Sequence, residues 1–134
     1  MAAEGGHVWD ISAASSGSLT SSQFYFVKLA AQDVVALCTG SSQGSARAFG
    51  VLQNDPDSGQ AAQVRKLGLT KLVAGGSIAV GDWIACSTGG TGLSAGTTGQ
   101  FCVAVANSAS TAAGQIIEAF MLPHGFLYNA NGTA

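Results

Sequence analysis

The stretch AQVRKLGLTKLV, from Ala62 to Val73, decides the fold of this 134-residue chain. Apolar and polar side chains are mixed at both sets of alternating positions, so neither face of the predicted strand is purely apolar. A glycine inside a strand commonly marks a bulge or a sharp bend. We therefore predict that the strand bends at Gly68 and passes from one sheet to another, as in a small β-barrel or β-sandwich.

Short apolar runs and turn signals alternate on both sides of this strand. Turn signals that recur about every 8 to 12 residues are typical of all-β barrels and sandwiches, and the 19 Gly and abundant Ser and Thr disfavour helix. The predicted fold class is therefore all-β, a small β-barrel or β-sandwich with an extended N-terminal arm and little helix. The other predicted strands are Phe24–Leu29, Val34–Cys38, Ala48–Gln53, Trp83–Cys86, Phe101–Ala106 and Gln115–Leu122, with brief apolar stretches at Ile78–Val80 and near Leu93.

The composition divides the chain into three segments. Residues 1–22 form a Ser/Gly-rich N-terminal arm, residues 23–122 the β domain, and residues 123–134 a C-terminal tail. The arm could lie on a neighbouring subunit or fold back on its own domain, and the residues leave both alternatives open. Interface cores are depleted in charge and enriched in aromatic residues. The candidate interface residues are therefore the apolar anchors of the two end segments, Val8, Trp9, Ile11, Phe126, Leu127 and Tyr128.

The charge and cysteine content exclude several classes of protein. Only 9% of residues are charged, against about 25% in typical soluble domains, and the five Lys and Arg are scattered, so nucleic acid is not an expected partner. No apolar run approaches the ~20 residues of a membrane span, and no secretory signal opens the chain, so we expect synthesis in the cytoplasm and no membrane partner. The three cysteines lack a C-x-x-C spacing and lie in apolar runs, which predicts buried thiols.

Candidate catalytic and metal-binding residues are sparse. Gly40–Gly44 matches the G-x-S-x-G pattern around Ser42, but that pattern needs a large α/β sheet around it. His7 and His124 have no partner at metal-ligand spacing, while Asp55 and Asp57 flank Pro56 in a predicted turn. We therefore predict no catalytic, cofactor-binding or metal-binding residues and no enzyme activity, with a hydrolase using Ser42 as a minor alternative.

Several motifs follow one another in an order that resembles the capsid decoration (cement) proteins of tailed phages. They are GVLQNDPDSG from Gly50 to Gly59, GLTKLV from Gly68 to Val73, AGGSIAVGD from Ala74 to Asp82 and GQIIE from Gly114 to Glu118. The resemblance covers about residues 48–122 and implies a compact β domain on the exterior of the virion capsid, which stabilises the expanded shell. It implies the major capsid protein as a partner, and we expect a homo-oligomer, with a trimer favoured.

A receptor-binding or glycan-binding virion module is the alternative function. Such a module needs exposed aromatic platforms in a polar groove. Trp83 and Tyr25 are the candidates in the body of the chain, and we expect both in the core.

Overall fold

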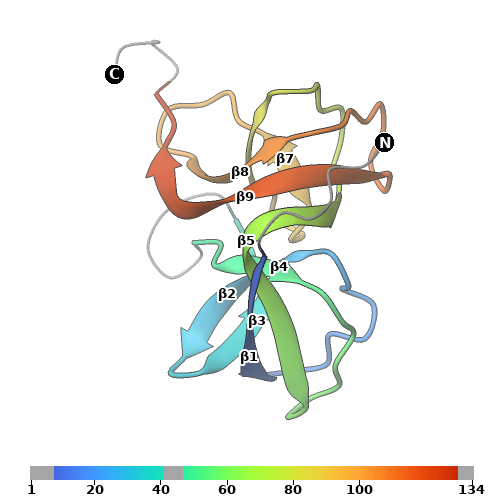
Figure 1. Cartoon of the computed structure of the whole chain (residues 1–134), viewed down its shortest axis with the longest axis vertical. Coiled ribbons are helices and arrows are strands. Elements are labelled where there is room, and N and C mark those ends of the chain that lie inside the picture. Colours follow the sequence, from blue (N-terminus) through green and yellow to red (C-terminus); the bar gives the residue numbers. More distant parts are fainter. Residues whose placement is uncertain (1–7, 41–46, 130–134) are drawn as a thin grey trace.

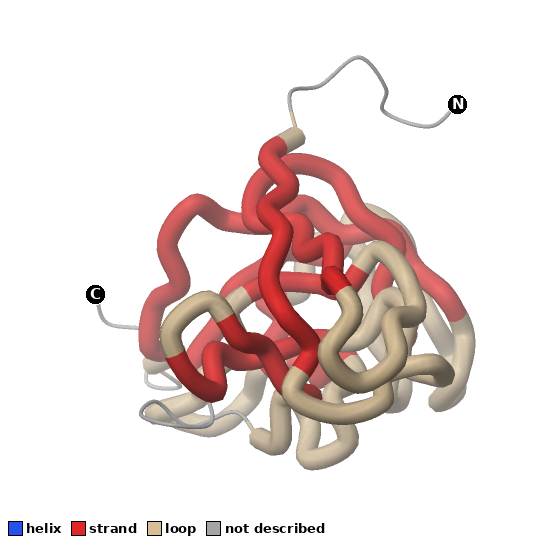
Figure 2. The backbone as a smooth tube through the Cα atoms, turned by 90° about the horizontal axis from the view of Figure 1, so that it is seen from below, coloured by secondary structure: helices blue, strands red, loops and turns tan. Residues whose placement is uncertain are grey.

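The computed structural model describes residues 8–40 and 47–129, and these residues form strands and turns without a helix (Figure 2). The all-β prediction is therefore confirmed. No helix that is long and apolar enough to cross a membrane occurs in the described ranges. The strands are β1 (Trp9–Ser15), β2 (Phe26–Ala31), β3 (Val34–Leu37), β4 (Gly50–Leu52), β5 (Ala61–Val73), β6 (Trp83–Cys86), β7 (Gly92–Ser94), β8 (Phe101–Ala106) and β9 (Ile116–Leu127).

Strand β5 runs through both halves of the molecule (Figure 1). Its first half belongs to a closed five-stranded barrel in the order β1-β3-β2-β4-β5. The barrel closes because β1 pairs with β3 in parallel on one side and with β5 in antiparallel on the other. The second half of β5 begins a second sheet, which continues through β9, β8 and β6 to β7. The predicted choice between barrel and sandwich is thus resolved as a barrel with an attached sheet.

The passage of β5 between the two sheets takes place at Gly68. Leu67 lies opposite Trp9 in the barrel, whereas Gly68 lies opposite Met121 in the second sheet. Gly68 has a φ of +100°, a backbone conformation that glycine adopts at little steric cost. The predicted bend at this glycine is confirmed.

Most predicted strands are present, with one extension. The runs around the Gln32-Asp33 turn form the antiparallel pair β2 and β3, and Asp33 has a φ of +57°, which an aspartate tolerates in a tight turn. The last strand was expected to stop at Leu122, but β9 continues past Pro123 to Leu127. Since β5 pairs with β9 only as far as Met121, the later part of β9 is an edge on that side, where a missing proline N–H is tolerated.

Two clusters of buried apolar side chains fill the two halves. The barrel cluster contains Val27, Val35, Leu52 and Val64, and the cluster of the second sheet contains Leu72, Ile84 and Ile117 together with Phe26 from the barrel strand β2. Burying each such side chain contributes roughly 1.5–3 kcal/mol. Because Phe26 belongs to the second cluster, the barrel and the second sheet pack directly against each other.

Candidate functional site

An exposed line of apolar side chains crosses the outer face of the second sheet. Phe120 of β9 lies opposite Leu69 of β5 on one side and opposite Val105 of β8 on the other. Val105 in turn lies opposite Trp83 of β6. Directly opposed residues of antiparallel strands project to the same face. We call these four residues the apolar row; Phe120 is 37% and Trp83 is 41% exposed, while Leu69 and Val105 are partly buried between and beside them.

The alternation of β9 explains why this face is apolar. Ile117, Ala119 and Met121 are buried and face the core. The intervening positions face outward, where a half-exposed sheet normally carries polar residues. Here they include Ile116, which is 57% exposed, and Phe120. The outer face of β9 therefore presents large apolar groups to solvent.

Trp83 is held in place by Phe126, one of the predicted interface residues. The two ring centroids are 4.9 Å apart and the rings meet edge to face at 86°. Edge-to-face contacts of this kind contribute about 0.5–1.5 kcal/mol beyond simple area burial. Phe126 thus supports one end of the apolar row from the same sheet, and it is itself half-buried.

The other predicted interface residues lie at two separate places. At the start of β1, Val8 and Trp9 are 49% and 57% exposed, while Ile11 packs against the barrel core. At the end of β9, Leu127 is 45% exposed. Tyr128 is half-buried, and its backbone N–H donates to the Gln100 carbonyl oxygen at 2.8 Å.

The structure brings Trp9 toward the apolar row through β5. Trp9 lies opposite Leu67, two positions before Leu69, the first member of the row. In Figure 1, the first residues of β1 lie at the bend of β5, where β5 leaves β1 and begins to pair with β9. Trp9 therefore lies near the β5 end of the apolar row, whereas Trp83 lies at its other end, on β6.

The prediction that Trp83 lies in the core is wrong, and the sequence analysis missed the apolar row. All four residues of the run WIAC are apolar, so the sequence does not distinguish the first residue, which faces outward, from the other three, which are buried. For β9 there was a signal: Glu118 shares the parity of Ile116 and Phe120, and a carboxylate marks the solvent side of a strand. The second body candidate, Tyr25, is half-buried.

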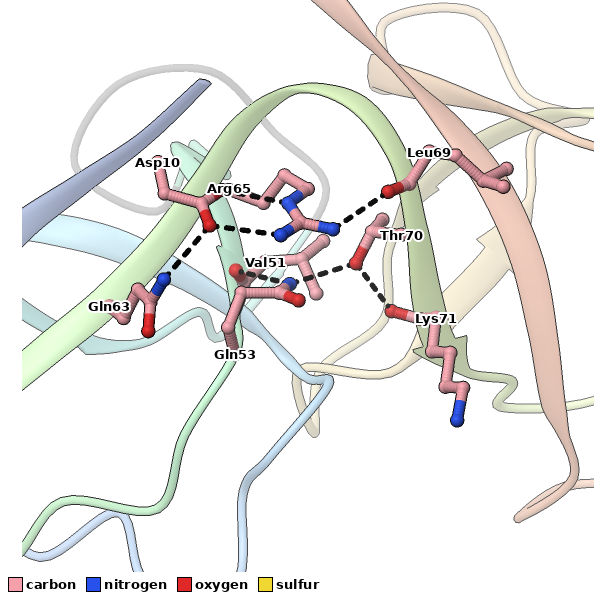
Figure 3. Close-up of polar contacts among 8 residues, drawn as sticks. All are labelled: Asp10, Val51, Gln53, Gln63, Arg65, Leu69, Thr70 and Lys71. Atoms are coloured by element: carbon pink, nitrogen blue, oxygen red, sulfur yellow. Dashed lines mark hydrogen bonds and ion pairs between the residues drawn. The ribbon is translucent and has the colours of Figure 1, made fainter. Parts of the chain in front are cut away.

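A polar cluster lies beside the row on the barrel side of the bend (Figure 3). The Arg65 guanidinium donates from Nε to Asp10 Oδ1 at 2.7 Å and from Nη2 to Asp10 Oδ2 at 2.9 Å. Its Nη1 donates to the Leu69 carbonyl oxygen at 2.9 Å. The hydrogen bond from Arg65 lowers the pKa of the Asp10 carboxyl below its usual value. The cluster ties β1 to both sides of the β5 bend.

The adjoining cleft has a volume of about 280 Å³ and is lined by Arg65 and Leu69 of this cluster and by Gln53 and Thr70. Gln53 donates from Nε2 to Thr70 Oγ1 at 2.8 Å and to the Val51 carbonyl oxygen at 3.1 Å. These polar groups bond to one another, so we interpret them as supports of the bend.

The other motifs contribute no arrangement for catalysis within residues 8–40 and 47–129. Ser42 and His7 lie outside the described residues, and His124 falls in β9 with a side chain that is also outside the description. No group of three or more His, Cys, Asp or Glu that could hold a metal ion occurs in the described part of the chain. Asp57 accepts the Ser58 N–H at 2.8 Å, which fits the predicted turn.

The chain is similar to phage proteins both in its sequence family and in its fold. No curated protein matches the chain. Among solved structures, the chain is similar to the N base of the head fiber gp8.5 in bacteriophage phi29, with 15% sequence identity, a TM-score of 0.61 and coverage of 90% of this chain and 98% of that chain. At this identity the similarity concerns the fold. The family described as phage cement protein matches residues 3–121, most of the chain, including β1. The chain therefore belongs to the phage cement protein family.

Proposed function

We propose that the chain binds the outer surface of a phage capsid through the apolar row and stabilises the expanded shell. Membership of the phage cement protein family supports the capsid as the partner. The exposure of Phe120 and Trp83 in one row across four strands is the observation that carries the choice of surface. Exposed apolar patches on soluble proteins mark interaction sites.

The low charge of the chain supports a lasting protein contact. Only 9% of residues are charged, and interface cores are depleted in charge. Burial of the apolar row against the major capsid protein releases water from apolar surface, which favours association. A protein that bridges several coat subunits binds them more strongly than any single contact, because all contacts must break together.

The end segments are proposed as secondary contacts with neighbouring subunits. Val8 and Trp9 at the start of β1 and Leu127 at the end of β9 are exposed, and the proposal extends to the other predicted anchors, Ile11, Phe126 and Tyr128. These contacts would serve a homo-oligomer, for which we propose a trimer. Analytical ultracentrifugation of the purified chain measures this directly.

The test is co-sedimentation with expanded and unexpanded shells of the cognate coat protein. We expect saturable binding at a fixed low-integer ratio, confined to expanded shells. Phe120→Lys places a charge in the apolar row and should weaken binding about tenfold or more, since each tenfold corresponds to about 1.4 kcal/mol. Leu29→Lys is the matched control, because Leu29 is 49% exposed on the barrel strand β2. Absence of binding at micromolar concentration contradicts the function, whereas equal effects of the two variants contradict only the surface.

The glycan-binding alternative requires an aromatic ring in a polar groove. Trp83 is exposed, but its neighbours in the row, Val105 and Phe120, are apolar. This setting favours a protein surface over a sugar. A chain that fails to bind shells but binds a glycan in an array screen would reverse this choice.

A further inference from the structure

Strand β1 has a free edge over most of its length. Its other edge pairs with β5 from Trp9 to Ala14, and the two strands run side by side in Figure 1. On the opposite side, β3 pairs only with Ala14 and Ser15. Because β3 begins at Val34, no strand of the described ranges borders Trp9–Ala13 on that side. The barrel is thus closed at one end of β1 and open at the other.

Backbone hydrogen bonds show which groups of β1 point to the free edge. The Ala14 N–H donates to the Asp33 carbonyl oxygen at 2.9 Å, on the side away from β5. Along an antiparallel ladder, every second residue points its N–H and C=O to the same side. The N–H and C=O groups of Asp10 and Ser12 therefore point to the free edge. They have no hydrogen-bond partner within the described residues.

This edge lacks the features that normally protect one. Proteins shield free strand edges with proline or lysine, or keep them very short. The later part of β9 contains Pro123, and the edge strand β7 is only three residues long. The sequence WDISA at Trp9–Ala13 has no proline or lysine, and its one charged side chain, Asp10, is bonded to Arg65 and Gln63. An unprotected edge of this kind is a template for a strand from another chain.

The two faces beside the edge define the kind of segment that fits. On one face, Ile11 packs against the barrel core and Trp9 is 57% exposed. On the other face, a cleft of about 360 Å³ is lined by residues that include Asp10, Ser12 and Gln63. Successive side chains of an added strand point to opposite faces. The edge therefore fits an extended segment in which apolar side chains beside Trp9 alternate with polar side chains over the cleft.

We propose that the free edge of β1 pairs with an extended segment of the major capsid protein, which adds a strand to the barrel. The identity of this partner rests on the proposed function. Trp9 lies near the β5 end of the apolar row, so one partner surface can extend over both sites. A second copy of the chain is the other occupant that the experiment distinguishes.

Hydrogen exchange, resolved residue by residue, tests the edge in the wild-type chain. In the isolated chain, the Asp10 and Ser12 amides should exchange rapidly, whereas the Ile11 and Ala13 amides, which point to β5, should be protected. On expanded shells of the cognate coat protein, exchange at Asp10 and Ser12 should slow about tenfold or more. The proposal is overturned if these two amides are already protected in the isolated chain, or if they stay unprotected on shells that carry the bound chain. Protection that rises with the concentration of the isolated chain identifies a second copy as the occupant and also overturns it.

Ser12→Pro removes one N–H from the free edge without breaking a bond to β5. Proline is tolerated at such a position of an edge strand, so the variant should fold, as thermal unfolding measures. Its binding to expanded shells should weaken about tenfold, because proline donates no hydrogen bond and its ring obstructs an added strand. Ser12→Ala is the matched control; it keeps the N–H and should bind like the wild-type chain. Equal losses in the two variants would assign the effect to the serine side chain and overturn the proposal.

The Phe120→Lys variant separates strand addition from the proposed function. If Ser12→Pro binds shells like the wild-type chain while Phe120→Lys binds weakly, strand addition is overturned and the apolar row stands. If the wild-type chain binds no shell, the function and the strand addition fail together. The exchange measurements use the wild-type chain, so they test the proposal even if Ser12→Pro does not fold.

Discussion

The indole of Trp83 and the ring of Phe126 meet edge to face with their centroids 4.9 Å apart, across the strand that separates β6 from β9. This contact orients an exposed tryptophan before any partner arrives. A side chain that is already held in one orientation loses less conformational entropy on binding. The apolar row is therefore partly preorganised at its Trp83 end.

Replacing Phe126 with Leu should expose one face of the Trp83 indole. We expect the free energy of unfolding to fall by about 1 kcal/mol and the tryptophan emission to shift to longer wavelength. The chain has two tryptophans, so the emission is best measured with Trp9→Phe in the background. Leu127→Ser is the control, because Leu127 is 45% exposed. An unchanged emission in the Phe126→Leu chain would show that the rings do not meet in solution.

The Asp10–Arg65 ion pair should make the stability depend on pH. The folded-state pKa of Asp10 is lowered by the hydrogen bond from Arg65, so its contribution is complete above the unfolded-state pKa of about 3.9 and is lost as the pH falls through the lower folded-state pKa. Asp10→Asn should cost about 1–2 kcal/mol of unfolding free energy at neutral pH.

Denaturant titrations over a range of pH measure this effect. The difference between the wild-type chain and Asp10→Asn should shrink below about pH 4. Asp55→Asn, at an exposed turn position, should change the stability by less than about 0.5 kcal/mol. A difference that is constant over the whole pH range would contradict the role of the ion pair.

Strand β1 should be an integral part of the barrel rather than a removable arm. Ala13 is 8% exposed and packs in the barrel core, so Ala13→Asp buries a charge and should cost at least about 3 kcal/mol. Ser12→Asp, one position earlier on the exposed side of the strand, should be nearly neutral. Thermal unfolding of the two variants measures the difference. Equal midpoints would mean that β1 does not pack in the barrel.

Gly50 should tolerate no side chain. A Cβ at this position would lie 2.5 Å from Val64 Cγ1 and 2.7 Å from the backbone oxygen of Arg65. Because a backbone atom cannot move aside easily, Gly50→Ala should destabilise the fold by about 1–3 kcal/mol. Gly17 has nothing within 4 Å of the same position, so Gly17→Ala is the control. Chemical denaturation of both variants tests this close approach of β4 to β5.

Local patterns predicted the strands well because each strand and turn depends on neighbouring residues. The bend at Gly68 and the turn at Asp33 follow from backbone preferences that are visible in the sequence. The closure of the barrel is different, because Ala14 pairs with Val34 in parallel and Ala61 in antiparallel. Such pairings join distant parts of the chain, and no local pattern specifies them.

The candidate site was predicted only in part for the same reason. The aromatic character of Phe126 and Trp9 was visible, but their exposure and surroundings depend on the register between strands. A shift of one residue would turn Trp83 or Phe120 into the core. Cys38 and Cys86 belong to one buried cluster although β3 and β6 do not pair, and sequence spacing carries no information about this.

The single strand β5 also determines how the molecule responds to force. It pairs with β1 over its first half and with β9 over its second half. A pull that acts on one half reaches the other along one covalent backbone and loads the two ladders lengthwise. Hydrogen bonds loaded in this direction must break together rather than one after another. The barrel and the second sheet are therefore coupled mechanically through β5, and the bend at Gly68 is the point through which the load passes.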